Sequence, residues 1–252
     1  FTNLLEVKLN STTINKYEVL NMGIPGSGPE AYILRLKKYF DVLKPEVVVF
    51  TIYNGNDFAN ANYDLTPDTG RINYKVINDE KNAKVERYSD IATAGEKIKW
   101  AVKTFVGKLL LVQFLNDVYL KTKTSNLAIT PTESSIPAYC DYSKENFENS
   151  QLIINNILLQ AKEIAGEKLI ALDIPDKKQV NFKENENCKR DVIEKGLNEF
   201  TKTNNIKYIS VLPDFEKSAT STYYVEHLNE NGHEIIATTL FNRLQKFLNL
   251  QK

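Results

Sequence analysis

The clearest pattern in the chain is a set of short apolar runs separated by longer segments of helical periodicity. The run at 48–53, Val-Val-Phe-Thr-Ile-Tyr, is β-branched and uncharged, which predicts a strand buried on both faces of a sheet. Similar runs at 169–174 and 206–211 predict two more strands. Because helical segments lie between the runs, the pattern favours an α/β domain with a mostly parallel sheet.

The first fifty residues predict a βαβ unit. A short helix at about 1–10 is followed by a predicted strand at 17–22 and a glycine-rich turn at 23–29. Pro29 suits the first position of a helix, which its apolar spacing extends to about Leu43. Since this helix leads into the first apolar run, we expect two parallel strands joined by a right-handed crossover.

The region from about 58 to 142 interrupts the alternation and predicts an insertion at the carboxyl edge of the sheet. It holds two possible short strands, 62–65 and 71–77, then a polar stretch, then a helical segment from about 94 to 120. The default interpretation packs this helix on the domain. The alternatives are a lid over an acyl pocket or contact with a membrane surface, and the helix is too short in apolar residues to span a bilayer.

The second half returns to regular alternation. Ser143 is a good N-cap for a long helix that ends at Gly166, before the second apolar run. A helix from about 188 to 203 precedes the third run, and a last helix follows His233. The whole chain therefore predicts a single domain, 1–252, with one insertion.

Composition excludes some classes of partner. Thirty-two basic and thirty-two acidic residues cancel among 252, so no overall field favours nucleic acid or an anionic membrane. Cys140 and Cys188 form either one disulfide, if the protein is exported, or two free thiols. We expect the true N-terminus to lie upstream of Phe1, so the missing export signal says little about location. An exported or cell-envelope protein is slightly favoured, and the oligomeric state stays open.

Three residues are candidates for one catalytic site at the carboxyl edge of the sheet. Gly26 offers a backbone N–H, Asn56 offers two side-chain amide donors, and His227 lies in a loop before the last helix. Acyl transfer needs two such donors for the oxyanion and an imidazole to move the proton. We therefore expect these three groups to face a common point.

These segments resemble a known family. Asn21–Gly26, then Gly55-Asn56-Asp57, then His227–His233 are similar to the second, third and fifth blocks of SGNH (GDSL-type) esterases and lipases. The resemblance implies a three-layer α/β/α sandwich of flavodoxin-like type, with about five mostly parallel strands. It also implies hydrolysis of carboxylic esters, with Gly26 and Asn56 in the oxyanion hole and His227 as the catalytic base.

The chain departs from the family pattern in two places. The family's nucleophile is the serine of a Gly-Asp-Ser turn after the first strand, and the resemblance places both ahead of Phe1. The family also has an aspartate two or three residues before its histidine, where this chain has Tyr224 and Val225. The adjacent Glu226 serves instead only if the loop bends locally or is one residue shorter. A catalytically inactive glycan- or acyl-binding protein on the same fold is the alternative.

Other candidates receive structural interpretations. Ser27 lacks the spacing of a nucleophile elbow, and His233 is expected to brace the start of the last helix. Asp173 and Asp214 flank strands and could approach the site, but solvated positions are the default. No histidine, cysteine or carboxylate set has metal-ligand spacing, so we expect no metal and no organic cofactor. The substrate is an acetylated sugar, a lipid or a small ester.

Overall fold

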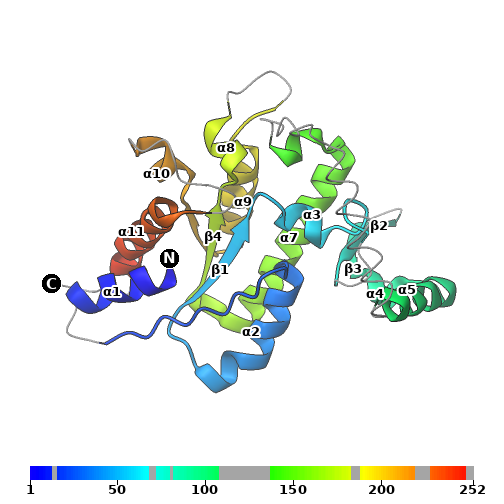
Figure 1. The fold of residues 1–252 in the computed structure, drawn as a ribbon, viewed down its shortest axis with the longest axis horizontal. Coiled ribbons are helices and arrows are strands. Elements are labelled where there is room, and N and C mark those ends of the chain that lie inside the picture. The colour runs from blue at the N-terminus through cyan, green and yellow to red at the C-terminus, as the bar shows by residue number, and fades with distance from the viewer. Residues whose placement is uncertain are drawn as a thin grey trace, which may run out of the picture.

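The computed structural model describes residues 1–12, 16–67, 72–79, 82–107, 137–182, 188–218 and 228–247. Among them, one parallel sheet has the strand order β1-β4-β5, as the ribbon in Figure 1 shows. Its strands are β1 (Val48–Tyr53), β4 (Leu169–Ile174) and β5 (Lys207–Ser210). In its register Ile52 pairs with Asp173, and Asp173 pairs with Ser210. The protein therefore has the mixed α/β architecture with a parallel sheet that the apolar runs predicted.

Helices pack on both faces of this sheet and form two hydrophobic clusters. Leu169 and Ala171 of β4 face one cluster, with α2 (Pro29–Leu43), α7 (Lys144–Ala165) and α9 (Val192–Thr203). Ile170, Leu172 and Ile174 face the other, with α1 (Thr2–Thr12), α10 (Leu212–Lys217) and α11 (Glu230–Phe247). Because successive strand side chains point to opposite faces, the continuous apolar run of β4 serves both clusters.

The predicted helices and strands of the second half are confirmed, with small shifts. The Ser143 side chain accepts a hydrogen bond from the Asn146 N–H at 3.1 Å, as expected of an N-cap. Helix α9 begins at Val192 rather than near 188, and α11 begins at Glu230, before His233. Three short elements join them, namely η1 (Ala138–Asp141), η2 (Gly166–Lys168) and α8 (Lys177–Asn181).

The insertion differs from its prediction. It begins with α3 (Asp57–Ala61) and continues in an antiparallel hairpin, β2 (Tyr74–Asp79) and β3 (Asn82–Arg87), then α4 (Tyr88–Ile91) and α5 (Ala94–Gly107). The predicted strand at 62–65 is wrong, since only an isolated bridge joins Asn62 to Tyr74. The stretch that looked polar forms β3 because Val85 packs against the core beside buried Val76. The predicted helix beyond 107 lies outside the described residues.

The predicted strand at 17–22 is also wrong. These residues have no strand partner among the described residues, and β1 pairs with β4 instead. A strand is defined by hydrogen bonds to a neighbour, so β-favouring sequence alone does not produce one. The parallel pair of the expected βαβ unit is therefore absent from the described sheet, although its helix α2 is present as Pro29–Leu43.

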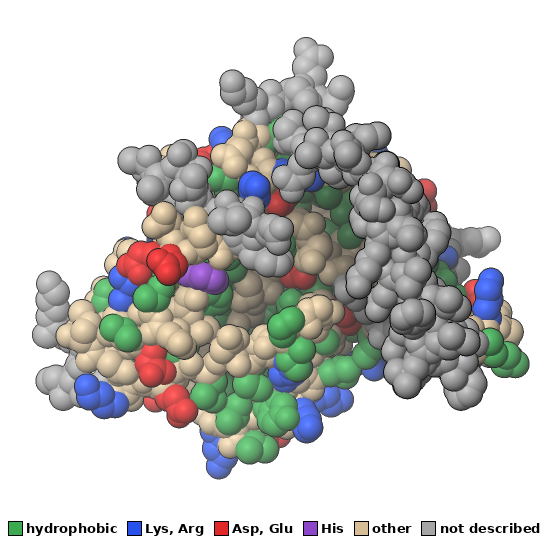
Figure 2. Space-filling view, viewed as in Figure 1, with side chains coloured by type: hydrophobic (Ala, Val, Ile, Leu, Met, Phe, Trp, Pro, Cys, Tyr) green, Lys and Arg blue, Asp and Glu red, His purple; other side chains and the backbone are tan. Residues whose placement is uncertain are grey.

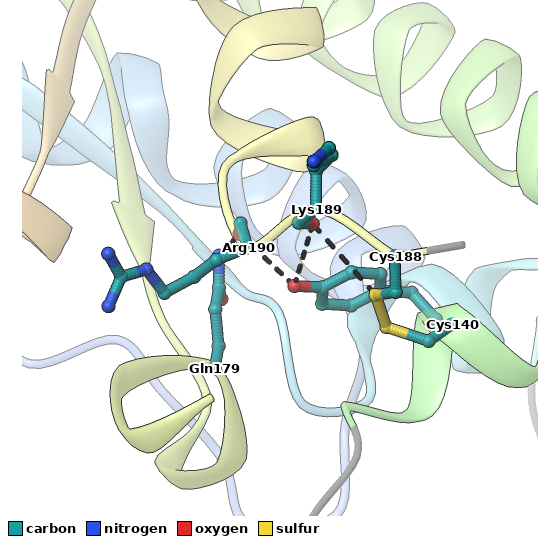
Figure 3. The surroundings of a disulfide bond; sticks show 6 residues. Cys140, Gln179, Cys188, Lys189 and Arg190 are labelled. Carbon is teal, nitrogen blue, oxygen red and sulfur yellow. Dashed lines mark hydrogen bonds between the residues drawn. A yellow bond between two sulfur atoms is a disulfide. The ribbon is translucent and has the colours of Figure 1, made fainter. Parts of the chain in front are cut away.

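A disulfide between Cys140 and Cys188 settles the alternative that the sequence left open. It joins η1 to the segment ahead of α9, as the close-up in Figure 3 shows. Both cysteines belong to the cluster that contains α7 and α9. Within the described part of the chain, no helix has the length and apolar character needed to cross a membrane.

Candidate functional site

The loop after β1 is fixed from both sides. The Tyr53 N–H donates to Oδ2 of Asp57 at 2.8 Å, and the Asn54 N–H donates to the Ile174 carbonyl at 2.9 Å. These bonds turn the chain out of the sheet and into α3, whose N-cap is Asn56. The small polar residues that end the apolar run thus stand at the carboxyl edge of the parallel sheet, where α/β proteins place ligands.

Asn56 is exposed, and its side chain does not cap α3. Neither amide atom of that side chain has a hydrogen-bond partner among the described residues. Its backbone carbonyl, in contrast, accepts the Asn60 N–H at 2.8 Å and so fixes the position of the residue. An anchored backbone with a free carboxamide can donate to a bound oxygen atom.

Gly26 lies in the turn that precedes α2. This turn is closed by the Ser27 N–H, which donates to the Ile24 carbonyl at 3.2 Å. Gly26 has φ of +75°, a left-handed conformation that favours glycine, and an added Cβ would have no atom within 4 Å. Gly26 is exposed, and its N–H has no hydrogen-bond partner among the described residues.

Gly26 and Asn56 are brought to the same end of β1. Helix α2 starts three residues after Gly26 and packs against α3, which begins directly after Asn56. Glu30 and Asp57 lie in the first turns of these two helices, and the Glu30 carboxylate is close enough to raise the pKa of Asp57. That the two donors point at one oxygen atom stays a prediction.

His227 and Glu226 lie outside the described residues, so their expected roles stay predictions. The next residue, Leu228, packs in the cluster of α1 and α11. Asn229 directly precedes α11, and its Oδ1 accepts the Gly232 N–H at 3.1 Å. The Nδ1 atom of His233 lies 3.1 Å from the Phe1 amino nitrogen. Burial, and then that amino group, lower the pKa of His233.

Two buried carboxyl groups lie near the loop after β1: Asp57 in the first turn of α3, and Asp173 in the neighbouring strand β4. Burial raises the pKa of Asp57 to about 7, although the Tyr53 N–H opposes the shift. Burial likewise raises the pKa of Asp173 to about 7, against hydrogen bonds from Tyr208 and Asn54. Asp173 is therefore a buried residue within β4 rather than the solvated one expected, and Asp214 falls in the first turn of α10.

A network of buried polar side chains ties β1 to α8. The Asn54 Nδ2 donates to Oε1 of Gln179 at 3.0 Å, and the Gln179 Nε2 donates to the Arg190 carbonyl at 2.8 Å. The Tyr139 hydroxyl donates to the same carbonyl at 3.1 Å, beside the disulfide (Figure 3). The Tyr208 hydroxyl donates to Oδ2 of Asp173 at 2.8 Å. This network positions the loop that carries Asn56.

Sequence reasoning missed this network. The one available signal was Asp173, a charged residue inside the otherwise apolar strand Leu-Ile-Ala-Leu-Asp-Ile. The Oδ1 atoms of Asp173 and Asn54 are buried, with no hydrogen-bond partner among the described residues. Within the same residues, no cluster of three or more histidine, cysteine or acidic side chains could hold a metal ion.

Comparison with known proteins adds no family assignment. No family model, no curated protein and no solved structure matches this chain.

Proposed function

We propose that this chain forms the body of a serine ester hydrolase of the SGNH type, acting on an acyl or acetyl ester of a carbohydrate, lipid or small molecule. One observation carries the proposal: the Asn56 side-chain amide and the Gly26 N–H have no hydrogen-bond partner among the described residues, and α2, which follows Gly26, packs against α3, which follows Asn56. Helices on both faces of the parallel sheet support the three-layer α/β/α architecture of that family.

In the proposed reaction the serine comes from a segment ahead of Phe1. Its Oγ attacks the ester carbonyl while His227 takes the hydroxyl proton. The Gly26 N–H and the Asn56 amide stabilise the oxyanion that forms. When the tetrahedral intermediate collapses, His227 returns the proton to the leaving alcohol, and water then releases the acid by the same steps. Glu226 is the acid available to orient His227.

Replacing Asn56 by alanine tests the oxyanion role. Loss of one donor costs about 3 kcal/mol in the barrier, so kcat for p-nitrophenyl acetate should fall roughly a hundredfold or more, with KM little changed. The assay needs the longer polypeptide that carries the serine. Asn198→Ala, at an exposed position on α9, is the matched control and should keep full activity. Near-full activity of Asn56→Ala would overturn the assignment.

A binding protein on the same fold is the second candidate, favoured by Tyr224 and Val225 at the positions where the family has its aspartate. Such a protein would hold a glycan or acyl group without cleaving it. Labelling with a fluorophosphonate probe separates the two candidates. A covalent adduct on a serine supports the hydrolase, and an unlabelled protein that still binds an acetylated sugar supports the binder.

A further inference from the structure

Helix α5 lies at the edge of the molecule, beyond α4 and the β2–β3 hairpin (Figure 1). Its described side chains, at positions 94–99, 101 and 102, are all exposed. Ile98 is 65% exposed and Val102 is 56% exposed, although both side chains are large and apolar. A surface helix of a globular domain normally buries its apolar face against the core. No described element covers the apolar residues of α5 in this way.

These apolar residues share one face of the helix. In the described part of α5 they are spaced by four, three and one positions, as Ala94, Ile98, Ala101 and Val102. This spacing produces a stripe along an α-helix, and this face is named the α5 stripe. Since each residue turns the helix by about 100°, Lys97 and Lys99 lie on either side of Ile98, at the two borders of the stripe.

The one acidic residue of α5, Glu96, faces away from the stripe and is already bound. Its carboxylate accepts hydrogen bonds from the Tyr88 hydroxyl, the Thr93 N–H and the Thr93 hydroxyl, each at 2.7 Å. The Tyr88 ring in turn stacks on the Tyr63 ring, with centroids 3.5 Å apart. The start of α5 is therefore fastened to the domain, and the charges that border the stripe are both positive.

We propose that the α5 stripe lies on the surface of an anionic lipid bilayer, with the helix axis in the plane of the interface. Such a surface offers acyl chains to Ile98 and Val102, and phosphate groups to the lysines. The aliphatic stems of Lys97 and Lys99 can lie along the stripe while their ammonium groups reach the headgroups. Because the net charge of the whole chain is zero, this attraction is local to the helix.

A lipid surface fits this geometry better than a protein partner does. An amphipathic helix that binds a protein is normally held in a groove with two walls. The described part of α5 instead has one narrow stripe on a helix that is exposed all round. A flat surface can cover that stripe and contact the lysine on each border at once. Figure 2 shows hydrophobic and basic side chains exposed together at this end of the molecule.

Vesicle flotation of the whole chain tests the proposal, and it is independent of ester hydrolysis because no substrate is present. One set of vesicles contains phosphatidylglycerol and phosphatidylcholine in equal parts, and the other contains phosphatidylcholine alone. Binding to the anionic vesicles should be stronger and should weaken as the salt concentration rises, because salt screens the phosphate charge. Failure to bind the anionic vesicles, or equal binding to both sets, would overturn the proposal.

Two double variants locate the contact on α5. Ile98→Asn with Val102→Asn removes the large apolar side chains of the stripe, and should lower the binding constant for the anionic vesicles at least about tenfold. Lys97→Gln with Lys99→Gln removes the charges at its borders, and should lower that constant about fivefold for each lysine lost. Hydrogen exchange of the α5 amides should also slow when anionic vesicles are added to the wild type.

Matched double variants elsewhere on the surface are the controls. Val7→Asn with Val42→Asn changes two exposed apolar residues on α1 and α2. Lys37→Gln with Lys202→Gln removes two exposed lysines from α2 and α9. Both controls should bind the anionic vesicles as the wild type does. Controls that lose as much binding as the α5 variants, or α5 variants that bind like the wild type, would contradict a contact through the stripe.

Two measurements without lipid test other occupants of the stripe. If sedimentation velocity shows a dimer that Ile98→Asn with Val102→Asn dissociates, the stripe belongs to a second copy of the chain. If the α5 amides of the free monomer exchange as slowly as those of the buried helix α7, another part of the same chain covers the stripe. Either result overturns the proposal, whereas a monomer with rapidly exchanging α5 amides supports it.

Discussion

Strands β4 and β1 come from apolar runs of the same length but end in different environments. All six residues of β4 are buried, whereas only Phe50 and Ile52 of β1 are. β4 has a strand on each side, and β1 has a strand on one side and a groove on the other. The comparison teaches that an apolar run predicts a strand but not its neighbours. A sequence suited to a central strand can thus also form the edge strand of the described sheet.

The largest expected effect comes from the disulfide that joins η1 to the segment ahead of α9. Cys140 and Cys188 are 48 residues apart, and chain-entropy arguments give a link of that span about 4 kcal/mol. Reduction should lower the free energy of unfolding by that order, measured by urea denaturation with and without dithiothreitol. The Cys140→Ala and Cys188→Ala double variant should show no further loss on reduction. An unchanged denaturation midpoint for the reduced wild type would show that the disulfide does not stabilise the folded protein.

Two leucines test the comparison of strands directly. Leu172 in β4 is fully buried, and Leu20 on the groove is half exposed. Leu172→Ala should cost about 3 kcal/mol in free energy of unfolding, because it leaves a cavity, and Leu20→Ala less than about 1 kcal/mol. Both are measured by urea denaturation. Equal costs for the two substitutions would contradict this difference in burial between Leu172 and Leu20.

A smaller effect is expected from pH. The folded pKa of Asp173, about 7, lies above its usual value of 3.8, so the folded state binds the proton more tightly. Its stabilising contribution is full below about pH 4 and is lost as pH rises through 7. Relative to wild type, Asp173→Asn should therefore gain about 1 kcal/mol or more in free energy of unfolding between pH 5 and pH 8.

Two further variants sharpen the pH experiment. Asp41→Asn, at an exposed position on α2, should show no such gain. Asp57, just past the end of β1, also has a pKa of about 7, so Asp57→Asn should remove part of the remaining slope. A wild-type stability that does not fall between pH 5 and pH 8 would mean that neither carboxyl holds its proton in the fold.

Much of the fold was predictable from local pattern. The runs at 48–53 and 169–174 are strands, and the helix from Pro29 to Leu43 has the predicted bounds. The errors arose where a distant partner decides the outcome. Residues 17–22 have strand-like sequence but no neighbour, whereas 82–87, which looked polar, form a strand because β2 pairs with them and α7 supports them.

The candidate site was predictable only in part, for the same reason. Asn56 was placed at the edge of the sheet because turn residues after a buried strand point there, whereas Gly26 was placed there from a strand at 17–22 that the described residues do not form. The link from Asn54 to Gln179 joins residues 125 positions apart, so no local spacing announces it. The pairing of Cys140 with Cys188 likewise depends on where two loops meet. His227 and Glu226 lie outside the described residues, and their roles rest on the family resemblance.

The Asn10 side chain has one further consequence. By occupying both the N–H and the carbonyl of Tyr17, it leaves that residue nothing to offer a chain arriving from outside. Tyr17 is therefore protected from backbone pairing with another molecule, which an unpaired extended segment otherwise invites.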